Sequence, residues 1–200
     1  DPAVRAAGLA YLKGAVDVAA YLGAPYLSGP FHSALGVFTG AKATQQEIDW
    51  SISGIREVAD HAATKNTTLC LEYLNRFESY LVSCADELYA LVEQINHPYV
   101  EIMFDTFHAN IEEVSTADAI RRIAKKTPHI QLSESTRGIL GEGQVNWPSV
   151  LQAIKEVNYG GWLVVEAFSE KLPAAHIWRK MFNSERELVE KSFRFIHGKW

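Results

Sequence analysis

The sequence predicts a single α/β domain built on a sheet of about five parallel strands. Short apolar segments alternate with longer segments whose apolar residues recur at helical spacing. The short segments are nearly continuous in apolar residues, as in strands that are covered on both faces. No segment rich in proline or serine divides the 200 residues, so we expect one domain over residues 1–200.

The first helix and strand are marked by their ends. Pro2 favours the first turn of an opening helix, and Gly23 ends that helix. A short apolar strand follows at residues 24–29. Thr44 and Glu47 then have the spacing of a capping box, which predicts the start of a second helix.

The middle of the chain repeats this order. Residues 67–74 form the second predicted strand. Ser83 and Asp86 resemble a helix cap, and the helix after them should end before Pro98, because a proline disfavours helical conformation in the preceding residue. The third predicted strand covers residues 99–105.

The last elements follow the same signals. Ser115 begins a helix that leads to a fourth strand at residues 129–134. Asn146 precedes Trp-Pro and opens a helix, after which residues 162–168 form the fifth strand. The polar region at 173–197 predicts one or two further helices.

Composition argues against several classes of protein. The formal charge is −5, and no basic block stands out, which disfavours nucleic acid or an anionic membrane as a partner. No apolar run approaches the roughly 20 residues of a membrane span. The N-terminal residues lack the pattern of a secretory signal, and Cys70 and Cys84 are too few for a disulfide framework. We therefore expect a cytoplasmic protein.

Polar residues lie near the carboxyl ends of the predicted strands. Four of them could converge in a parallel sheet: Glu72, Asp105, Gln131 and Glu166. Parallel α/β proteins place their sites at this end of the sheet. Three carboxylates brought together would repel one another unless a cation offsets their charge. A divalent metal site is therefore the favoured interpretation, with separate solvated carboxylates as the alternative.

Four segments carry a resemblance to a known family: LEYLNRFE (71–78), FDTFHANIEE (104–113), SESTRGILGEGQVNW (133–147) and VVEAF (164–168). Together they resemble the D-tagatose 3-epimerase / L-ribulose 3-epimerase group of the xylose-isomerase-like sugar isomerases and epimerases. The resemblance extends over essentially the whole chain. It implies a (β/α)8 TIM barrel, a divalent metal, usually manganese, and reversible C3 epimerisation of a free ketose.

The resemblance also implies roles for individual residues. The metal ligands map to Glu72, Asp105, residue 131 and Glu166. The catalytic acid and base map to Glu72 and Glu166, acting through a metal-bound cis-enediolate. The substrate contacts map to Glu78, His108 and Arg137. The plain alternatives are a structural histidine at His108, an exposed ion pair at Arg137 and a solvated loop charge at Glu78.

Gln131 departs from the family pattern His-x-His-Leu-Gly-Glu, because it replaces the second histidine in residues 129–134. Its amide oxygen can still bind a cation, as a harder and weaker donor than imidazole. The substitution should shift the preference from zinc or cobalt towards manganese, magnesium or calcium. We therefore expect manganese, with magnesium or cobalt as possible replacements. His129 lies one pleat deeper on the same face and cannot simply replace the lost ligand.

The second departure is length, since a complete barrel typically needs about 250 residues. The five strands resemble the last five of eight, and the family's first three βα units have no counterpart in this chain. An open sheet exposes apolar edges. We therefore expect an incomplete barrel whose open side is covered by a homo-oligomer or another partner, or a rearranged packing.

The leading functional prediction is a metal-dependent epimerase or isomerase whose partner is a small-molecule ketose. Two alternatives stay open. One is a catalytically impaired barrel fragment that serves as a non-catalytic subunit or scaffold. The other is an endonuclease IV-like metal nuclease, which the acidic charge balance disfavours.

Overall fold

The computed structural model describes residues 1–199, and Lys199 only by its backbone; Trp200, the last residue of the predicted domain, lies outside this range. Five parallel strands form one sheet in the order β1-β2-β3-β4-β5. They are β1 (Tyr26–Gly29), β2 (Thr68–Glu72), β3 (Val100–Asp105), β4 (His129–Ser133) and β5 (Trp162–Glu166). The predicted fold class, an incomplete barrel of parallel strands alternating with helices, is confirmed.

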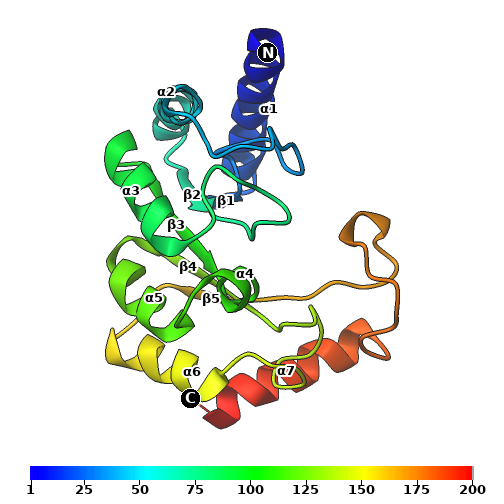
Figure 1. Ribbon diagram of the computed structural model, residues 1–200. Coiled ribbons are helices and arrows are strands. Elements are labelled where there is room, and N and C mark those ends of the chain that lie inside the picture. Colours follow the sequence, from blue (N-terminus) through cyan, green and yellow to red (C-terminus); the bar gives the residue numbers. More distant parts are fainter. Residues whose placement is uncertain (200) are drawn as a thin grey trace.

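Helices alternate with the strands along the chain, beginning with α1 before β1. They are α1 (Pro2–Tyr21), α2 (Gln45–Thr64), α3 (Ala85–Ile95), α4 (Thr106–Glu112), α5 (Thr116–Ile123), η1 (Ala124–Lys126), α6 (Trp147–Glu156), η2 (Pro173–Ala175) and α7 (Glu185–Lys199). Figure 1 shows α2, α3, α5 and α6 in succession along the outside of the sheet. None of these helices has the length and apolar character of a membrane span.

The sheet curls strongly toward its inner face. Ser28 on β1 lies with its Oγ 2.8 Å from Nδ1 of His129 on β4, although β2 and β3 separate these strands in the sheet. Only a curved sheet brings β1 and β4 this close across the interior. The sheet therefore has an inner face, which carries alternate residues of each strand, and an outer face covered by helices.

The main apolar core lies between the outer face and the helices. Leu71, Ile102 and Leu132 are buried there and belong to one cluster with helix residues such as Leu88 and Ile154. Full burial of each such side chain contributes roughly 1.5–3 kcal/mol. This layer fixes the direction of each strand, and so the place where its carboxyl end delivers a polar side chain.

Two local predictions differ from the structure, and one helix was not predicted. The segment after β3 is the helix α4, which the side chain of Asp105 caps by accepting a hydrogen bond from the backbone N–H of Phe107. The cap of α3 is Cys84 without a side-chain bond, in place of Ser83. Trp162 on the inner face of β5 is 62% exposed, so this strand is not covered on both faces.

Replacing Ile102 with alanine should destabilise the protein by about 2–5 kcal/mol, because it removes a fully buried side chain from the outer-face core. Urea unfolding followed by circular dichroism measures this loss. Val164→Ala is the matched control, since Val164 is 37% exposed on the inner face and should lose less. Equal losses for the two variants would contradict the assignment of the core to the outer face.

Candidate active site

The carboxyl ends of three strands bring acidic side chains to the inner face. Glu72 ends β2, Asp105 ends β3 and Glu166 ends β5. Asp105 is paired in register with Gln131 on β4. Glu72 and Asp105 are buried, and Glu166 is half-buried. The four positions predicted from the sequence therefore occupy the same end of the sheet.

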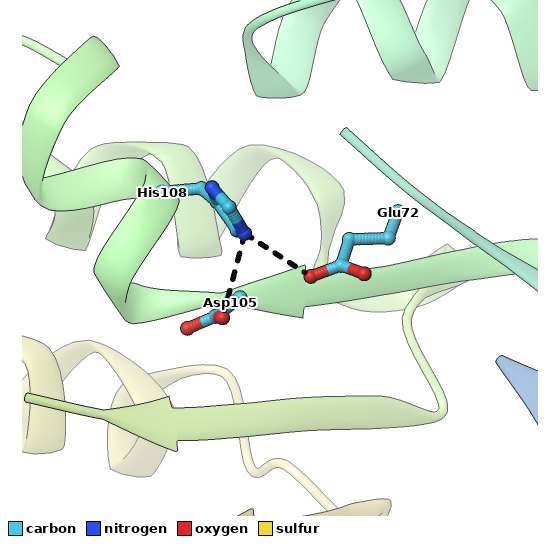
Figure 2. A group of neighbouring side chains, drawn as sticks. All are labelled: Glu72, Asp105 and His108. Atoms are coloured by element: carbon cyan, nitrogen blue, oxygen red, sulfur yellow. Dashed lines mark ion pairs between the residues drawn. The ribbon is translucent and has the colours of Figure 1, made fainter. Parts of the chain in front are cut away.

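His108 joins two of these acids from the first turns of α4. Its Nε2 lies 3.6 Å from Oε1 of Glu72 and 3.8 Å from Oδ2 of Asp105. Figure 2 marks both contacts with dashed lines. Potential ligand atoms of the three side chains all lie within 4.8 Å of one another, and all three residues are buried. Such a group of oxygen and nitrogen donors has the chemistry to hold a divalent cation.

Arg137 bridges the acids of β3 and β5. Its Nη1 donates to Oδ2 of Asp105 at 2.7 Å, to Oγ of Ser133 at 2.7 Å, and to Oε2 of Glu166 through a very short contact. Only 6% of Arg137 is exposed, so it is not the exposed ion pair that the sequence left open. The guanidinium is the cation that the protein itself supplies to this cluster.

Two aromatic rings and an unusual backbone conformation hold Arg137 in place. Its guanidinium carbon lies 3.7 Å from the centre of the Phe107 ring and 4.7 Å from that of Phe168. The residue has a φ of 57°, in the left-handed region that non-glycine residues adopt rarely. The backbone N–H of Arg137 donates a hydrogen bond to the carbonyl of Glu134 at 2.8 Å, which stabilises this turn.

Glu134 anchors the loop that presents Arg137. It is completely buried, and its carboxylate accepts four hydrogen bonds, from the backbone N–H groups of Ser135 (2.8 Å), Gly141 (3.0 Å) and Val145 (3.1 Å) and from the indole of Trp147 (2.7 Å). Burial alone would raise the pKa of Glu134, but these donors lower it below the usual value. In the sequence, only the position of Glu134 at the end of a predicted strand pointed to this role.

Gln131 presents an unpartnered atom to the interior. Its amide oxygen Oε1 is buried and makes no hydrogen bond within the described structure. A buried polar oxygen without a partner is costly, which a bound cation would relieve. The residues present therefore fit a metal, and two ligand sets share Glu72 and Asp105. The first set adds His108, because its ring nitrogen lies close to the oxygens of both acids. The second set adds Gln131 and Glu166, which the family resemblance implies.

Glu78 reaches the cluster through a residue that the sequence did not single out. Asn75 is buried and donates from its side-chain nitrogen to Oε1 of Glu78 at 2.8 Å. The same nitrogen lies 2.9 Å from Nδ1 of His108. The predicted substrate contacts at positions 78, 108 and 137 are thus linked to the acids on one side of the sheet.

Burial and mutual repulsion shift the titration of the cluster. Burial, followed by the charges of Asp105 and Glu166, raises the pKa of Glu72 well above its usual value. Burial also raises the pKa of Asp105 to about 7, although the nearby Arg137 opposes this shift. Burial and then the charge of Arg137 lower the pKa of His108 to about 3, so this imidazole is neutral.

The raised pKa of Asp105 predicts a pH-dependent stability of the metal-free protein. Between its ordinary value of 3.8 and its folded value of about 7, the folded state binds more protons than the unfolded state. Stability should therefore fall as pH rises through this range. Differential scanning calorimetry of chelator-treated protein should show a melting temperature that falls by several degrees, and a smaller fall in Asp105→Asn. An identical pH profile in that variant would contradict the prediction.

Comparison with known proteins places this geometry in context. The family model described as "Xylose isomerase-like TIM barrel" matches residues 1–196. An L-ribulose 3-epimerase of Methylomonas sp. (strain DH-1) is 30% identical over the whole chain and 72% of the relative. A ketose 3-epimerase of Arthrobacter globiformis is 33% identical over the whole chain and 71% of the relative.

The fold agrees with solved structures as well. The crystal structure of a D-allulose 3-epimerase from Methylomonas sp. in complex with D-allulose superposes with a TM-score of 0.95 at 30% identity. The match covers the whole of this chain and 71% of that one. Sequence and structure therefore lead to the same group of proteins.

Proposed function

This chain belongs to the xylose isomerase-like TIM barrel family, and we propose that it catalyses the reversible C3 epimerisation of a free ketose. Its relatives are sugar epimerases, so it is an enzyme of the sugar isomerase and epimerase class. The observation that carries the specific reaction is the pair of acids, Glu72 and Glu166, on the inner face of β2 and β5. Ketoses such as D-allulose and L-ribulose, named in the relatives, are the first substrates to test.

The acids supply the proton transfers. Epimerisation removes the C3 proton from one face of the sugar and returns a proton to the other face. In one direction Glu166 removes the proton and Glu72 delivers one, and the two exchange roles in the reverse direction. In the metal-free protein, burial and the charges of Asp105 and Glu166 raise the pKa of Glu72 well above its usual value.

The neighbouring side chains stabilise the charge that develops. His108 lies beside Glu72 and Arg137 beside Glu166, and both donate hydrogen bonds to the oxygen that becomes negative in the enediolate. Glu78, tied to Asn75, orients the sugar hydroxyls. Glu72, Asp105, Gln131 and Glu166 would hold the cation. When bound, a divalent cation polarises the ketose carbonyl and so acidifies the adjacent proton.

Solvent exchange tests the proposed chemistry. Incubation with Mn²⁺ and a ketose in deuterated water should place deuterium at C3 and produce the epimer, as NMR and mass spectrometry detect. Glu166→Gln should reduce both by on the order of 10²- to 10⁴-fold, because the amide cannot accept a proton. Glu142→Gln, at an exposed ion pair with Lys191, is the matched control. Absence of deuterium and epimer for every ketose tried would refute the proposal.

Gln131 favours a metal harder than zinc. Gln131→His should tighten Co²⁺ binding by about tenfold or more, equivalent to ~1.4 kcal/mol, and Mg²⁺ binding less, because imidazole is the softer donor. Isothermal titration calorimetry measures both affinities. Gln131→Leu, which deletes the amide oxygen, should weaken binding of both ions. Unchanged affinities in both variants would remove residue 131 from the ligand set.

The names of the relatives favour sugar chemistry over the nuclease alternative. The choice of manganese, the cytoplasmic location and the homo-oligomer or partner that covers the open side of the barrel stay predictions. The non-catalytic alternative also stays open, and the replacement of a histidine by Gln131 is the observation that supports it.

A further inference from the structure

The orientation of the Asn75 amide is fixed by two neighbours of opposite character. The backbone N–H of Phe77 donates to Oδ1 of Asn75 at 3.0 Å. The other end of the amide, Nδ2, donates to the carboxylate of Glu78 at 2.8 Å. A backbone N–H can only donate and a carboxylate accepts, so the reversed amide would lose both bonds.

This orientation places two donors on one ring nitrogen of His108. Nδ1 of His108 lies 3.1 Å from the backbone nitrogen of Asn75 and 2.9 Å from its Nδ2. A ring nitrogen that accepts from N–H groups must keep its lone pair. The single proton of the neutral imidazole is therefore on Nε2.

The contact with Arg137 does not overturn this assignment. Nη2 of Arg137 lies 3.2 Å from Nε2 of His108, and both groups carry protons in this tautomer. In the opposite tautomer, Nε2 could accept from Arg137, but a proton on Nδ1 would then face both N–H donors of Asn75. Nε2 also faces oxygens of Glu72 at 3.6 Å and Asp105 at 3.8 Å, which favour a proton there.

We propose that Asn75 is a positioning residue that holds His108 in its Nε2–H tautomer, as a hydrogen-bond donor to substrate rather than a metal ligand. A histidine that binds a cation through Nε2 needs a lone pair on that atom. The tautomer therefore excludes His108 from the ligand set despite its short distances to Glu72 and Asp105. The proposed ligand set is then Glu72 and Asp105 together with Gln131 and Glu166. The inference rests on the proposed function for its catalytic meaning.

The ring protonation can be read directly by NMR. Long-range ¹H–¹⁵N spectra of the protein labelled at histidine ring nitrogens distinguish Nε2–H from Nδ1–H. The His108 signals are assigned by their loss in His108→Gln. The wild-type protein should show the proton on Nε2, and saturation with diamagnetic Mg²⁺ should leave it there. A proton on Nδ1, or loss of the Nε2 proton with Mg²⁺, would overturn the inference.

Substitution tests whether Asn75 sets the tautomer. Asn75→Asp replaces the Nδ2 donor with a carboxylate oxygen, so Nδ1 of His108 should acquire a proton. Glu78→Gln is the matched control, because it neutralises the adjacent charge, keeps the Asn75 donor and should preserve the wild-type tautomer. An Nδ1 that stays unprotonated in Asn75→Asp would refute the role of Asn75. If that variant fails to fold, the wild-type spectrum alone decides the tautomer.

Kinetics separate this inference from the proposed function. In Asn75→Asp, kcat for the ketose should fall by roughly a hundredfold, the loss typical of one hydrogen-bond donor to a developing negative charge, while the Kd for Mn²⁺ stays close to wild type. A large loss of Mn²⁺ affinity in His108→Gln would indicate that His108 is a ligand and would overturn the inference. If the wild-type protein converts no ketose, the proposed function fails, and the NMR result still decides the tautomer.

Discussion

The structure depends on how it balances the charge of the carboxylates gathered at one end of a curled sheet. Glu72, Asp105 and Glu166 contribute three negative charges when ionised, and Arg137 offsets one of them. The remaining two equal the charge of one divalent cation. Without that cation, burial drives Glu72 toward its protonated form. The cation and the proton on Glu72 are therefore two ways of offsetting the same buried negative charge.

A buried carboxylate can also be stable without a cation, as Glu134 demonstrates. Four N–H donors surround it and lower its pKa, whereas within the described residues no backbone N–H or indole donates to the Glu72 carboxylate, and burial raises its pKa. The fixed loop then delivers Arg137 to Asp105. The surroundings of a buried glutamate thus decide whether it anchors a loop, as Glu134 does, or stays available for proton transfer, as Glu72 does.

Much of the fold could be predicted from the sequence because its signals are local. Apolar runs, caps and the polar residues at strand ends gave the parallel sheet and brought Glu72 and Asp105 together. The roles of Asn75 and Glu134 could not be predicted in this way. The contact of Asn75 with His108 spans 33 residues and exists only after β2 and β3 pair. The exposure of Trp162 likewise depends on how the strands curve, which periodicity does not encode.

The hydrogen bond between Ser28 and His129 has a consequence for the order in which the molecule assembles. It joins residues 101 positions apart, so the intervening chain must be arranged before the bond can form. Contacts between residues far apart in the sequence slow folding, because the entropy of loop closure is lost before the contact can stabilise the chain. The helices with local caps can form early, and the inner lining of the sheet completes late. We therefore expect the interior that holds the acids to be among the last parts of the protein to become native.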